Sequence, residues 1–362
     1  MSKQPRLTGL TDPNATGVVV GVGIDPSAIG EPIALIDPAL ARSVHEELLE
    51  ALTLNGRVVF TSTTDRDAFI DQVKTLPTGV AKQWEALIAS GRIRLEILDP
   101  PVEPGLAETL DVQEIADRLA TRVDLVLLER EHAELLGVPP DSFSVLAPGG
   151  RPELGRLSTA TRTRAMVRAR ELLTAPIRAG DNREDIWRDR LAPLVGVTKS
   201  VVVYDRYAGA HAARRYVYNL RSRDGLTWLL AKVAQTGSKR VRLITAAMEE
   251  EGGRAMGPEV ISDGLQQLRW AMGEANVQLD VVIVPDGAQR FGHDRHLRFG
   301  ERVALALGPG LQIFSTQRAD ETITVARLPI ADARDRERGS EHHQIRPPAE
   351  GWITNRPPGP GS

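Results

Sequence analysis

The sequence predicts an α/β protein of two domains, and three observations lead to this prediction. The chain has 362 residues, of which 41% are hydrophobic and 26% charged; these values are typical of globular proteins, and the length suits two or three domains of roughly 100–200 residues each. Short apolar runs alternate with stretches of helical periodicity in residues 17–147, and the same alternation starts again at Lys199. A Pro/Gly-rich stretch, APGGRPELGR at 147–156, separates the two series.

In the first series, each expected strand is a short apolar run bounded by Gly, Asp or Pro, and each expected helix has apolar residues spaced to line one face. The strands are expected at 18–24, 33–36, 57–61, 93–98, 123–128 and 143–146. The helices are expected at 38–54, 65–74, 81–89, 111–120 and 131–136. Such alternation is typical of a mainly parallel sheet with helices on both faces, so residues 17–147 are expected to form an N-terminal α/β sandwich.

The rest of the chain divides by the same criteria. Residues 148–198 are expected to form a helical, basic connector, with helices at 158–173 and 183–191. A second α/β domain is expected at 199–330, with strands at 201–204, 241–245, 279–284, 303–307 and 311–314 and helices at 225–235 and 258–274. The polar residues 1–16 predict a flexible arm, and residues 331–362 lack a period and predict a disordered tail.

The two halves carry opposite charge, although the whole chain has a net charge of only −3. Residues 1–150 contain 12 Lys and Arg against 23 Asp and Glu, a balance of −11, whereas residues 151–330 contain 28 against 20, a balance of +8. This asymmetry favours separate domains or an anionic partner for the basic half. The alternative is that both surfaces use their charges only for solubility.

Several classes of function are excluded by residues or motifs that the sequence lacks. With 0 Cys, the chain has no disulfides, thiolate metal sites or cysteine nucleophiles. No P-loop, nucleophile elbow or HExxH motif is present. The sequence also has no apolar run of about 20 residues and no apolar signal segment at its start, so we expect a cytoplasmic protein.

Three aspartates each follow an apolar strand: Asp37, Asp205 and Asp286. Ligands of open α/β sheets bind at the carboxyl ends of strands, so each aspartate is a candidate site residue. The alternative is that each one caps the next helix or forms the turn.

A second candidate is the stretch Gly292–Arg298, which contains His293, Arg295 and His296. If it is a strand, His293 and Arg295 lie on one face. A guanidinium offers two parallel donors to phosphate oxygens, and an imidazole can add a donor or attack phosphorus. Two alternatives stay open: a metal site that pairs His293 with His296, and a structural strand in which Arg295 pairs with an acid such as Asp205.

Residues 199–328 resemble the C-terminal, phospholipase D-like domain of MIT-domain proteins linked to the ESCRT machinery, in a bacterial version. Three features carry the resemblance: Asp205-Arg206-Tyr207 after a strand, the strand VRLIT at 241–245, and His293-Asp294-Arg295 followed by a strand and the turn Gly308–Phe314. Arg206 stands where the family commonly has Pro. The resemblance implies a phospholipase D-like fold and a phosphate-binding site at His293, Arg295, Asp205 and Tyr207.

The resemblance also favours binding over catalysis. The parent phospholipase D pattern is His-x-Lys, then four residues and Asp, present twice. This chain has a single His293-Asp294-Arg295, with Gly300 in place of the Asp. Because the eukaryotic relatives are catalytically silent dimers that bind membrane phosphoinositides, the resemblance implies a homodimer in which His293 is at most a candidate catalytic residue.

Residues 17–147 are distantly similar to PIN-like nucleases, which hydrolyse phosphodiesters with Mg²⁺ held by three or four acids. That similarity implies a metal site at Asp37, Glu114, Asp117 and Asp124. Magnesium is expected only under this nuclease hypothesis, and otherwise we expect no cofactor.

The leading hypothesis is a non-catalytic, phosphate-recognising module that serves in a larger bacterial assembly. Its expected partners are a nucleic acid, nucleotide or lipid headgroup, a second copy of the chain, and proteins encoded by neighbouring genes. The alternatives are a nuclease or phosphodiesterase, acting at a dimeric His293/Arg295 site or at the acidic metal site, and a pure protein-interaction adaptor.

Overall fold

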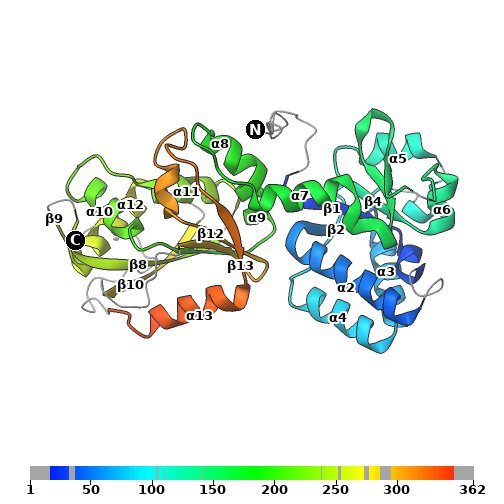
Figure 1. Ribbon diagram of the computed structural model, residues 1–362, viewed down its shortest axis with the longest axis horizontal. Helices are drawn as coiled ribbons and strands as arrows, with labels where there is room; N and C mark the ends of the chain where they lie inside the picture. Colours follow the sequence, from blue (N-terminus) through cyan, green and yellow to red (C-terminus); the bar gives the residue numbers. More distant parts are fainter. Residues whose placement is uncertain are drawn as a thin grey trace, which may run out of the picture. The chain divides into compact units, whose positions relative to one another are not determined.

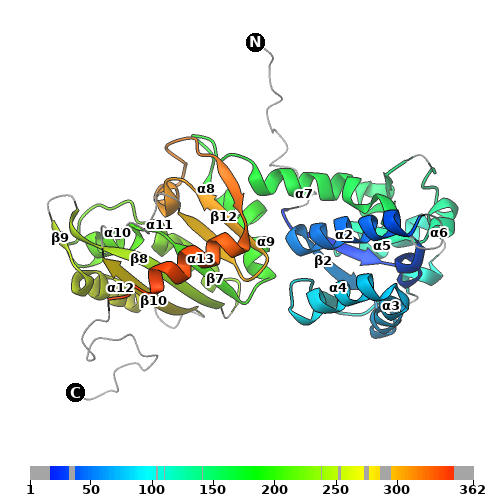
Figure 2. The same ribbon diagram turned by 60° about the horizontal axis from the view of Figure 1, so that its bottom comes forward.

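The structure is a computed structural model that describes residues 17–31, 37–102, 105–109, 111–140, 142–237, 239–251, 254–272, 277–285 and 295–345. It divides the chain into two units, Met1–Leu173 and Thr174–Ser362, which are described separately (Figures 1 and 2). Both units are mixed α/β, so the predicted fold class is confirmed.

The first unit is an α/β sandwich whose helices cover both faces of one sheet. Its elements, in chain order, are β1 (Val20–Ile24), a 3₁₀ helix (Pro26–Gly30), α2 (Pro38–Asn55), β2 (Gly56–Phe60), α3 (Thr63–Thr75), α4 (Thr78–Ala89), β3 (Leu95–Ile97), α5 (Val112–Leu119), β4 (Leu125–Leu128), α6 (Arg130–Leu135), β5 (Ser144–Leu146), β6 (Glu153–Arg156) and α7 (Arg164–Thr174).

The strand order is β3-β2-β1-β4-β6-β5, and every neighbouring pair is parallel except β5 with β6. Successive residues of the central strands face opposite sides, so both sides of the sheet are apolar. One face packs against α2, α3, α4 and α7, around Trp84 and Phe69, and the other packs against α5 and α6. The mainly parallel sandwich predicted from the alternation of strands and helices is therefore confirmed.

The expected connector at 148–198 is not a separate element. Residues Glu153–Arg156 form β6, which pairs with β4 inside the first sheet because its ELGR sequence is fully buried there. The rest of this range is divided at Leu173, and residues from Thr174 onward belong to the second unit. With this boundary, the first unit has 18 Lys and Arg against 25 Asp and Glu, and the second has 27 against 23, so the charge contrast falls to −7 against +4.

The second unit begins with the helices that sequence reading assigned to a connector. Its elements are α8 (Arg183–Ile186), a π-helical turn (Trp187–Leu191), α9 (Ala192–Gly196), β7 (Ser200–Tyr204), α10 (Ala208–Tyr216), α11 (Gly225–Ala234), β8 (Lys239–Glu251), β9 (Arg254–Met256), α12 (Pro258–Met272), β10 (Val277–Pro285), β11 (His296–Phe299), β12 (Val303–Leu307), a 3₁₀ helix (Gly310–Phe314), β13 (Val325–Leu328) and α13 (Ile330–Glu341).

The second sheet has the order β10-β8-β7-β11-β12-β13, with β9 paired to β8. The pairs β10–β8 and β8–β7 are parallel, whereas β11, β12 and β13 add antiparallel strands. Helix α10 packs on one face, where the Gly209 N–H donates to Thr245 Oγ1 at 3.0 Å. The carboxyl end of β7, at Tyr204, lies next to the start of α10, at Ala208.

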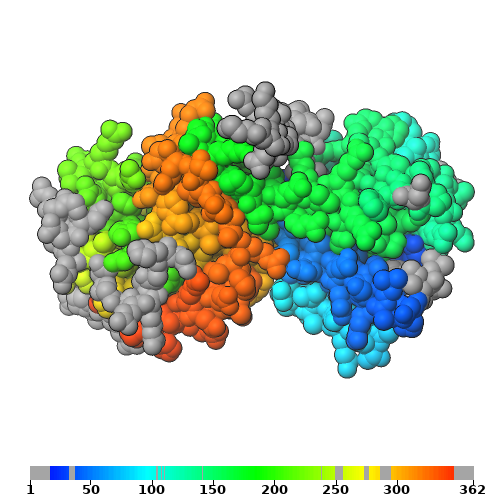
Figure 3. All heavy atoms as spheres, viewed as in Figure 1, coloured from blue at the N-terminus to red at the C-terminus, as the bar shows by residue number. Residues whose placement is uncertain are grey.

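Helix α13 covers the opposite face, so the prediction of a disordered tail at 331–362 is wrong for residues 331–341. It lies against the sheet in both ribbon views and forms part of the surface of the unit in the space-filling view (Figures 1, 2 and 3). The reason is a buried polar attachment, which hydropathy does not detect. Glu337 accepts from Arg298 with both carboxylate oxygens, at 2.8 and 2.6 Å, and lies 3.1 Å from His296 Nε2. Tyr204 adds a hydroxyl contact of 3.0 Å to Ser340.

One more predicted strand is wrong, and three predicted segments lie partly or wholly outside the described residues. Residues 311–314 form a 3₁₀ helix instead of a strand, because Gly310 turns the chain at a φ of 75°. The arm at 1–16, the strand at 33–36 and residues 346–362 of the tail lie outside the described residues. Within the described ranges, no helix is long and apolar enough to cross a membrane.

The attachment of α13 predicts a large effect of one carboxylate. Replacing Glu337 by Ala leaves Arg298 and His296 without their buried partner, so we expect the free energy of unfolding to fall by about 3–5 kcal/mol. Asp335→Ala is the control, since Asp335 and its partner Arg338 are both well exposed, and its effect should stay below about 0.5 kcal/mol. Urea unfolding of the full chain measures both, and equal effects would show that the polar attachment does not hold the helix.

Candidate functional site

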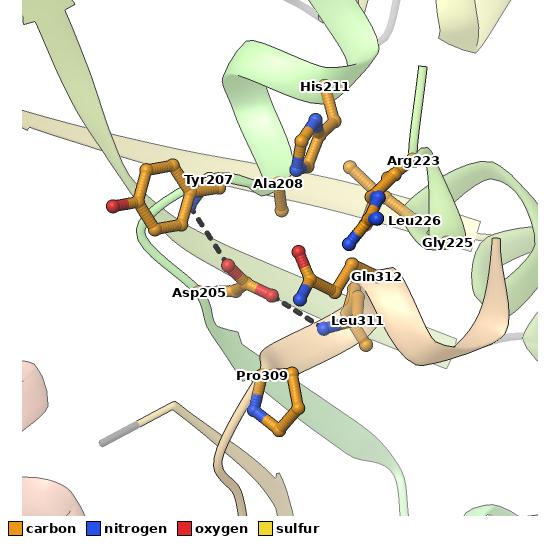
Figure 4. Close-up of a pocket in the computed structure, with 10 residues that line it drawn as sticks. All are labelled: Asp205, Tyr207, Ala208, His211, Arg223, Gly225, Leu226, Pro309, Leu311 and Gln312. Carbon is orange, nitrogen blue, oxygen red and sulfur yellow. Dashed lines mark hydrogen bonds between the residues drawn. The ribbon is translucent and has the colours of Figure 1, made fainter. Parts of the chain in front are cut away.

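The candidate site is a hollow at the carboxyl end of β7 in the second unit. The space between its lining residues is about 200 Å³ when open solvent is included, so the hollow is a shallow surface feature and not an enclosed cavity. Three segments surround it: the start of α10, the start of α11 and the 3₁₀ helix Gly310–Phe314. The lining residues, drawn in Figure 4, are Asp205, Tyr207, Ala208, His211, Arg223, Gly225, Leu226, Pro309, Leu311 and Gln312.

Asp205 organises the wall of this hollow. Its side chain is buried, and each carboxylate oxygen accepts a backbone N–H: Oδ1 from Tyr207 at 2.9 Å and Oδ2 from Leu311 at 2.7 Å (Figure 4). Burial raises the pKa of Asp205, while the Leu311 N–H, the positive charge of Arg295 and the Tyr207 N–H oppose that rise. Asp205 thus forms the turn into α10, as the structural alternative expected, and also joins that turn to the 3₁₀ helix 106 residues away.

Gly310 permits this close approach. Its φ of 75° is rarely adopted by other residues, and a Cβ at this position would overlap Asp205 Oδ2 and Cδ of Arg295. Arg295 is fixed on the same side, because its Nη1 donates to the Pro309 carbonyl and its guanidinium carbon lies 4.7 Å from the ring centroid of Tyr207. Arg295 is therefore held by a carbonyl and an aromatic ring beside the carboxylate of Asp205.

Three other side chains converge on the open part of the hollow. Figure 4 shows His211, Arg223 and Gln312 pointing toward one another from α10, from the segment before α11 and from the 3₁₀ helix. Arg223 is exposed and forms no ion pair with any residue that the structure describes. Guanidinium, imidazole and carboxamide groups can all donate hydrogen bonds, so the arrangement suits an anion with several acceptor oxygens.

The structure brings together three of the four residues predicted to bind phosphate. Asp205, Tyr207 and Arg295 meet at one wall of the hollow. His293 and Asp286 lie outside the described residues. His296, considered as a metal ligand, is buried on the α13 side against Glu337. Sequence reading did not select His211, Arg223 and Gln312; the dense run of arginines at 206–223 is the signal that marks the first two.

The four acids predicted to bind Mg²⁺ lie apart. Asp37 caps α2, where its Oδ1 accepts from the Ala39 N–H, on the sheet face opposite to α5. Glu114 and Asp117 lie on α5, where Glu114 pairs with Arg118 and Asp117 accepts from Gln113. Asp124 precedes β4, where it accepts the Gly21 N–H at 2.7 Å at the amino end of the parallel strands. Within the described ranges, no three carboxylate or imidazole groups lie close enough to hold a metal ion.

A different pair occupies the carboxyl end of the first sheet, where β1 and β4 meet. Asp25 directly follows β1, and its Oδ2 lies 3.1 Å from His132 Nδ1; His132 Nε2 lies 2.7 Å from the Thr109 carbonyl. Both ring nitrogens face acceptors, which favours the charged form of the imidazole, and the hydrogen bond to Asp25 raises the pKa of His132. Asp25 has the same strand-end position as the three aspartates selected from the sequence, so this position was the signal for it.

Comparisons with known proteins add no family to this geometry. No protein-family model matches the chain, and no curated protein shows significant similarity to it. The resemblance to phospholipase D-like and PIN-like domains therefore stays a prediction made from the sequence.

The geometry at Gly310 predicts a sharp difference between two neighbouring glycines. Gly310→Ala places a methyl group against Asp205 and Arg295 at a positive φ, so we expect a loss of at least about 2 kcal/mol in the free energy of unfolding. Gly308→Ala is the matched control, because a Cβ there meets no atom within 4 Å. Thermal unfolding of the two variants distinguishes them, and similar melting temperatures would contradict the described contact.

The Asp25–His132 pair predicts a pH dependence of stability. The pKa of His132 is raised on folding, so its contribution is complete below about pH 6.5, its ordinary value, and is lost as the pH rises through the higher value of the folded state. Burial acts to raise the pKa of Asp25, but the hydrogen bonds from His132 and Ser27 outweigh it, so this pKa is lowered. The contribution of Asp25 to stability is therefore lost only in acid. We expect the free energy of unfolding to decline above pH 6.5 in the wild type and to decline less in His132→Gln. Identical urea-unfolding profiles between pH 5 and 9 would show that His132 is not held as a cation.

Proposed function

We propose that the second unit is a non-catalytic module that recognises a phosphate-bearing ligand at the hollow beside Asp205. The observation that carries this proposal is the convergence of Arg223, His211 and Gln312 on a space whose only carboxylate, among the lining residues, already accepts two backbone N–H groups. Three donor side chains from three segments therefore face one small volume.

The chemistry of these groups fits a phosphate. The Arg223 guanidinium offers two parallel donors to a pair of phosphate oxygens, while His211 and Gln312 each offer one more donor to the remaining oxygens. A carboxylate beside an anion is ordinarily repulsive. Here both Asp205 oxygens are directed at backbone N–H groups, and the fixed charge of Arg295 offsets the negative charge.

Recognition is favoured over cleavage by the same set of residues. Among the residues that line the hollow, His211 is the one imidazole, and no lysine, serine, threonine or cysteine accompanies it. A phosphodiesterase that forms a phospho-histidine also needs an acid for the leaving group, and the one carboxyl group that lines the hollow, Asp205, directs both oxygens at backbone N–H groups. The single His293-x-Arg295 pattern supports the same reading, because the phospholipase D pattern requires two copies.

Titration of the full chain with pyrophosphate, followed by calorimetry, tests the proposal. Each of Arg223→Ala and His211→Ala removes a hydrogen bond to a charged group, worth about 1.5–3 kcal/mol, so we expect affinity to fall at least about tenfold. Lys199→Ala is the matched control, since it removes one exposed positive charge before the amino end of β7, the end opposite to Asp205. If all three variants weaken pyrophosphate binding equally, the binding is due to the overall charge of the protein and the proposed site is wrong.

A cleavage assay addresses the rival hypothesis. Wild-type protein incubated with bis(p-nitrophenyl) phosphate, with and without Mg²⁺, is expected to release no nitrophenol. Metal-independent release that disappears in His293→Ala would overturn the non-catalytic proposal and favour an active site shared by two chains.

A further inference from the structure

The hollow is continuous with a segment of unusual composition. Residues 206–223 read RYAGAHAARRYVYNLRSR, with five arginines, three tyrosines, one histidine and no acid. Of this segment, Tyr207, His211 and Arg223 line the hollow with polar side chains, and Arg223 is the only arginine among them. Two further arginines of the segment, Arg215 and Arg221, are exposed. Arg215 also pairs with the next residue after the segment, Asp224, whose Oδ2 lies 3.3 Å from its Nη1.

The fold turns this composition into a surface that leads away from the hollow. After α10 ends at Tyr216, residues 217–224, here called the return segment, run back along the helix. The Leu220 N–H donates to the Arg214 carbonyl at 2.9 Å, and Ser222 Oγ donates to the His211 carbonyl at 2.7 Å. Arg221 is placed between these two contacts, and Arg223 reaches the hollow. Arg215, Arg221 and Arg223 are all exposed along this path.

Two arginines of the segment are positioned by aromatic rings. The guanidinium carbon of Arg215 lies 5.3 Å from the ring centroid of Tyr216, and that of Arg206 lies 5.5 Å from the ring centroid of Tyr207. Such cation–π contacts restrict the long side chains before any ligand binds, so less conformational entropy is lost on binding. Guanidinium planes held on aromatic rings are also surfaces on which unpaired nucleobases stack.

We propose that the ligand of the hollow is single-stranded nucleic acid, with one phosphate in the hollow and the following phosphates along the return segment. This inference rests on the proposed function and names its substrate class. Successive exposed arginines can each bind one phosphate of a strand. The Arg–Tyr pairs offer flat surfaces on which unpaired bases can stack.

A membrane surface fits the same charges less well. Stable docking on a bilayer combines basic side chains with apolar side chains that enter the interface. In the described part of the second unit, the one large apolar side chain that is exposed is Trp270, on α12 and outside the 206–223 segment. Phosphoinositide vesicles are therefore a competing ligand in the test.

The test is fluorescence anisotropy of the full chain with a labelled dT12 oligonucleotide at several salt concentrations. Because Arg215 is paired with Asp224, the two remaining exposed arginines predict a slope of log K against log[salt] of about −1.4, at about 0.7 for each neutralised phosphate of a single strand. The double variant Arg221→Ala/Arg223→Ala should nearly abolish this slope, whereas Lys199→Ala should leave it near about −1.4. An abasic 12-mer should bind about tenfold more weakly than dT12, because base stacking is lost.

The outcomes separate this inference from the function on which it rests. If pyrophosphate binds but dT12 binds no tighter and shows no salt slope, the nucleic-acid inference is overturned and phosphate recognition stands. If neither ligand binds, both fail. A 12-bp duplex that binds as tightly as dT12 overturns the single-strand assignment. Phosphoinositide vesicles that retain the protein against excess dT12 overturn the choice of nucleic acid over membrane.

Discussion

The carboxylate of Asp205 is the interaction on which the architecture of the candidate site depends. It is buried at the end of β7 and accepts one N–H from the turn into α10 and one from the 3₁₀ helix Gly310–Phe314. A buried carboxylate is costly unless such donors surround it, so the two segments and the strand end are fixed together. Gly310 is the complement of this arrangement, since any side chain there would occupy the space of the carboxylate and of Arg295.

Helices are held to the sheets either by apolar stripes or by buried polar contacts, and only the first kind was predicted from the sequence. Helices α2, α4 and α5 bury apolar stripes, which repeat with the helical period, so their positions were predictable to within a few residues. Helix α13 is held mainly by Glu337 and Ser340, with Ala333 as its one buried apolar residue. Because a polar anchor has no periodic signature, this stretch was expected to be disordered. The strand β6 was not predicted for a related reason: its sequence, ELGR, is too short and too polar to be distinguished from a turn.

The candidate site was predictable in its anchors but not in its lining. Asp205, Tyr207 and Arg295 carry local signals, namely a strand end and a charged residue near a strand, and the structure does bring them together. His211, Arg223 and Gln312 meet only because a return segment and a 3₁₀ helix converge on α10, which is a long-range consequence of the fold. In the first unit, Asp37 and Asp124 were predicted as site residues because each is an acid near a strand. The structure gives them other roles: Asp37 caps a helix, and Asp124 lies at the amino end of the sheet.

The return segment has a consequence for how this protein can diverge. Its exposed arginines project from a loop that is tied to α10 through a main-chain N–H at Leu220 and the hydroxyl of Ser222. Substitution at positions 221 and 223 therefore leaves the carboxylate–glycine contact and both apolar faces of the sheet intact, whereas Arg215 also pairs with the buried carboxylate of Asp224. Under the proposed function, ligand preference can therefore change through substitutions at the surface, while the contacts that hold the fold involve other residues.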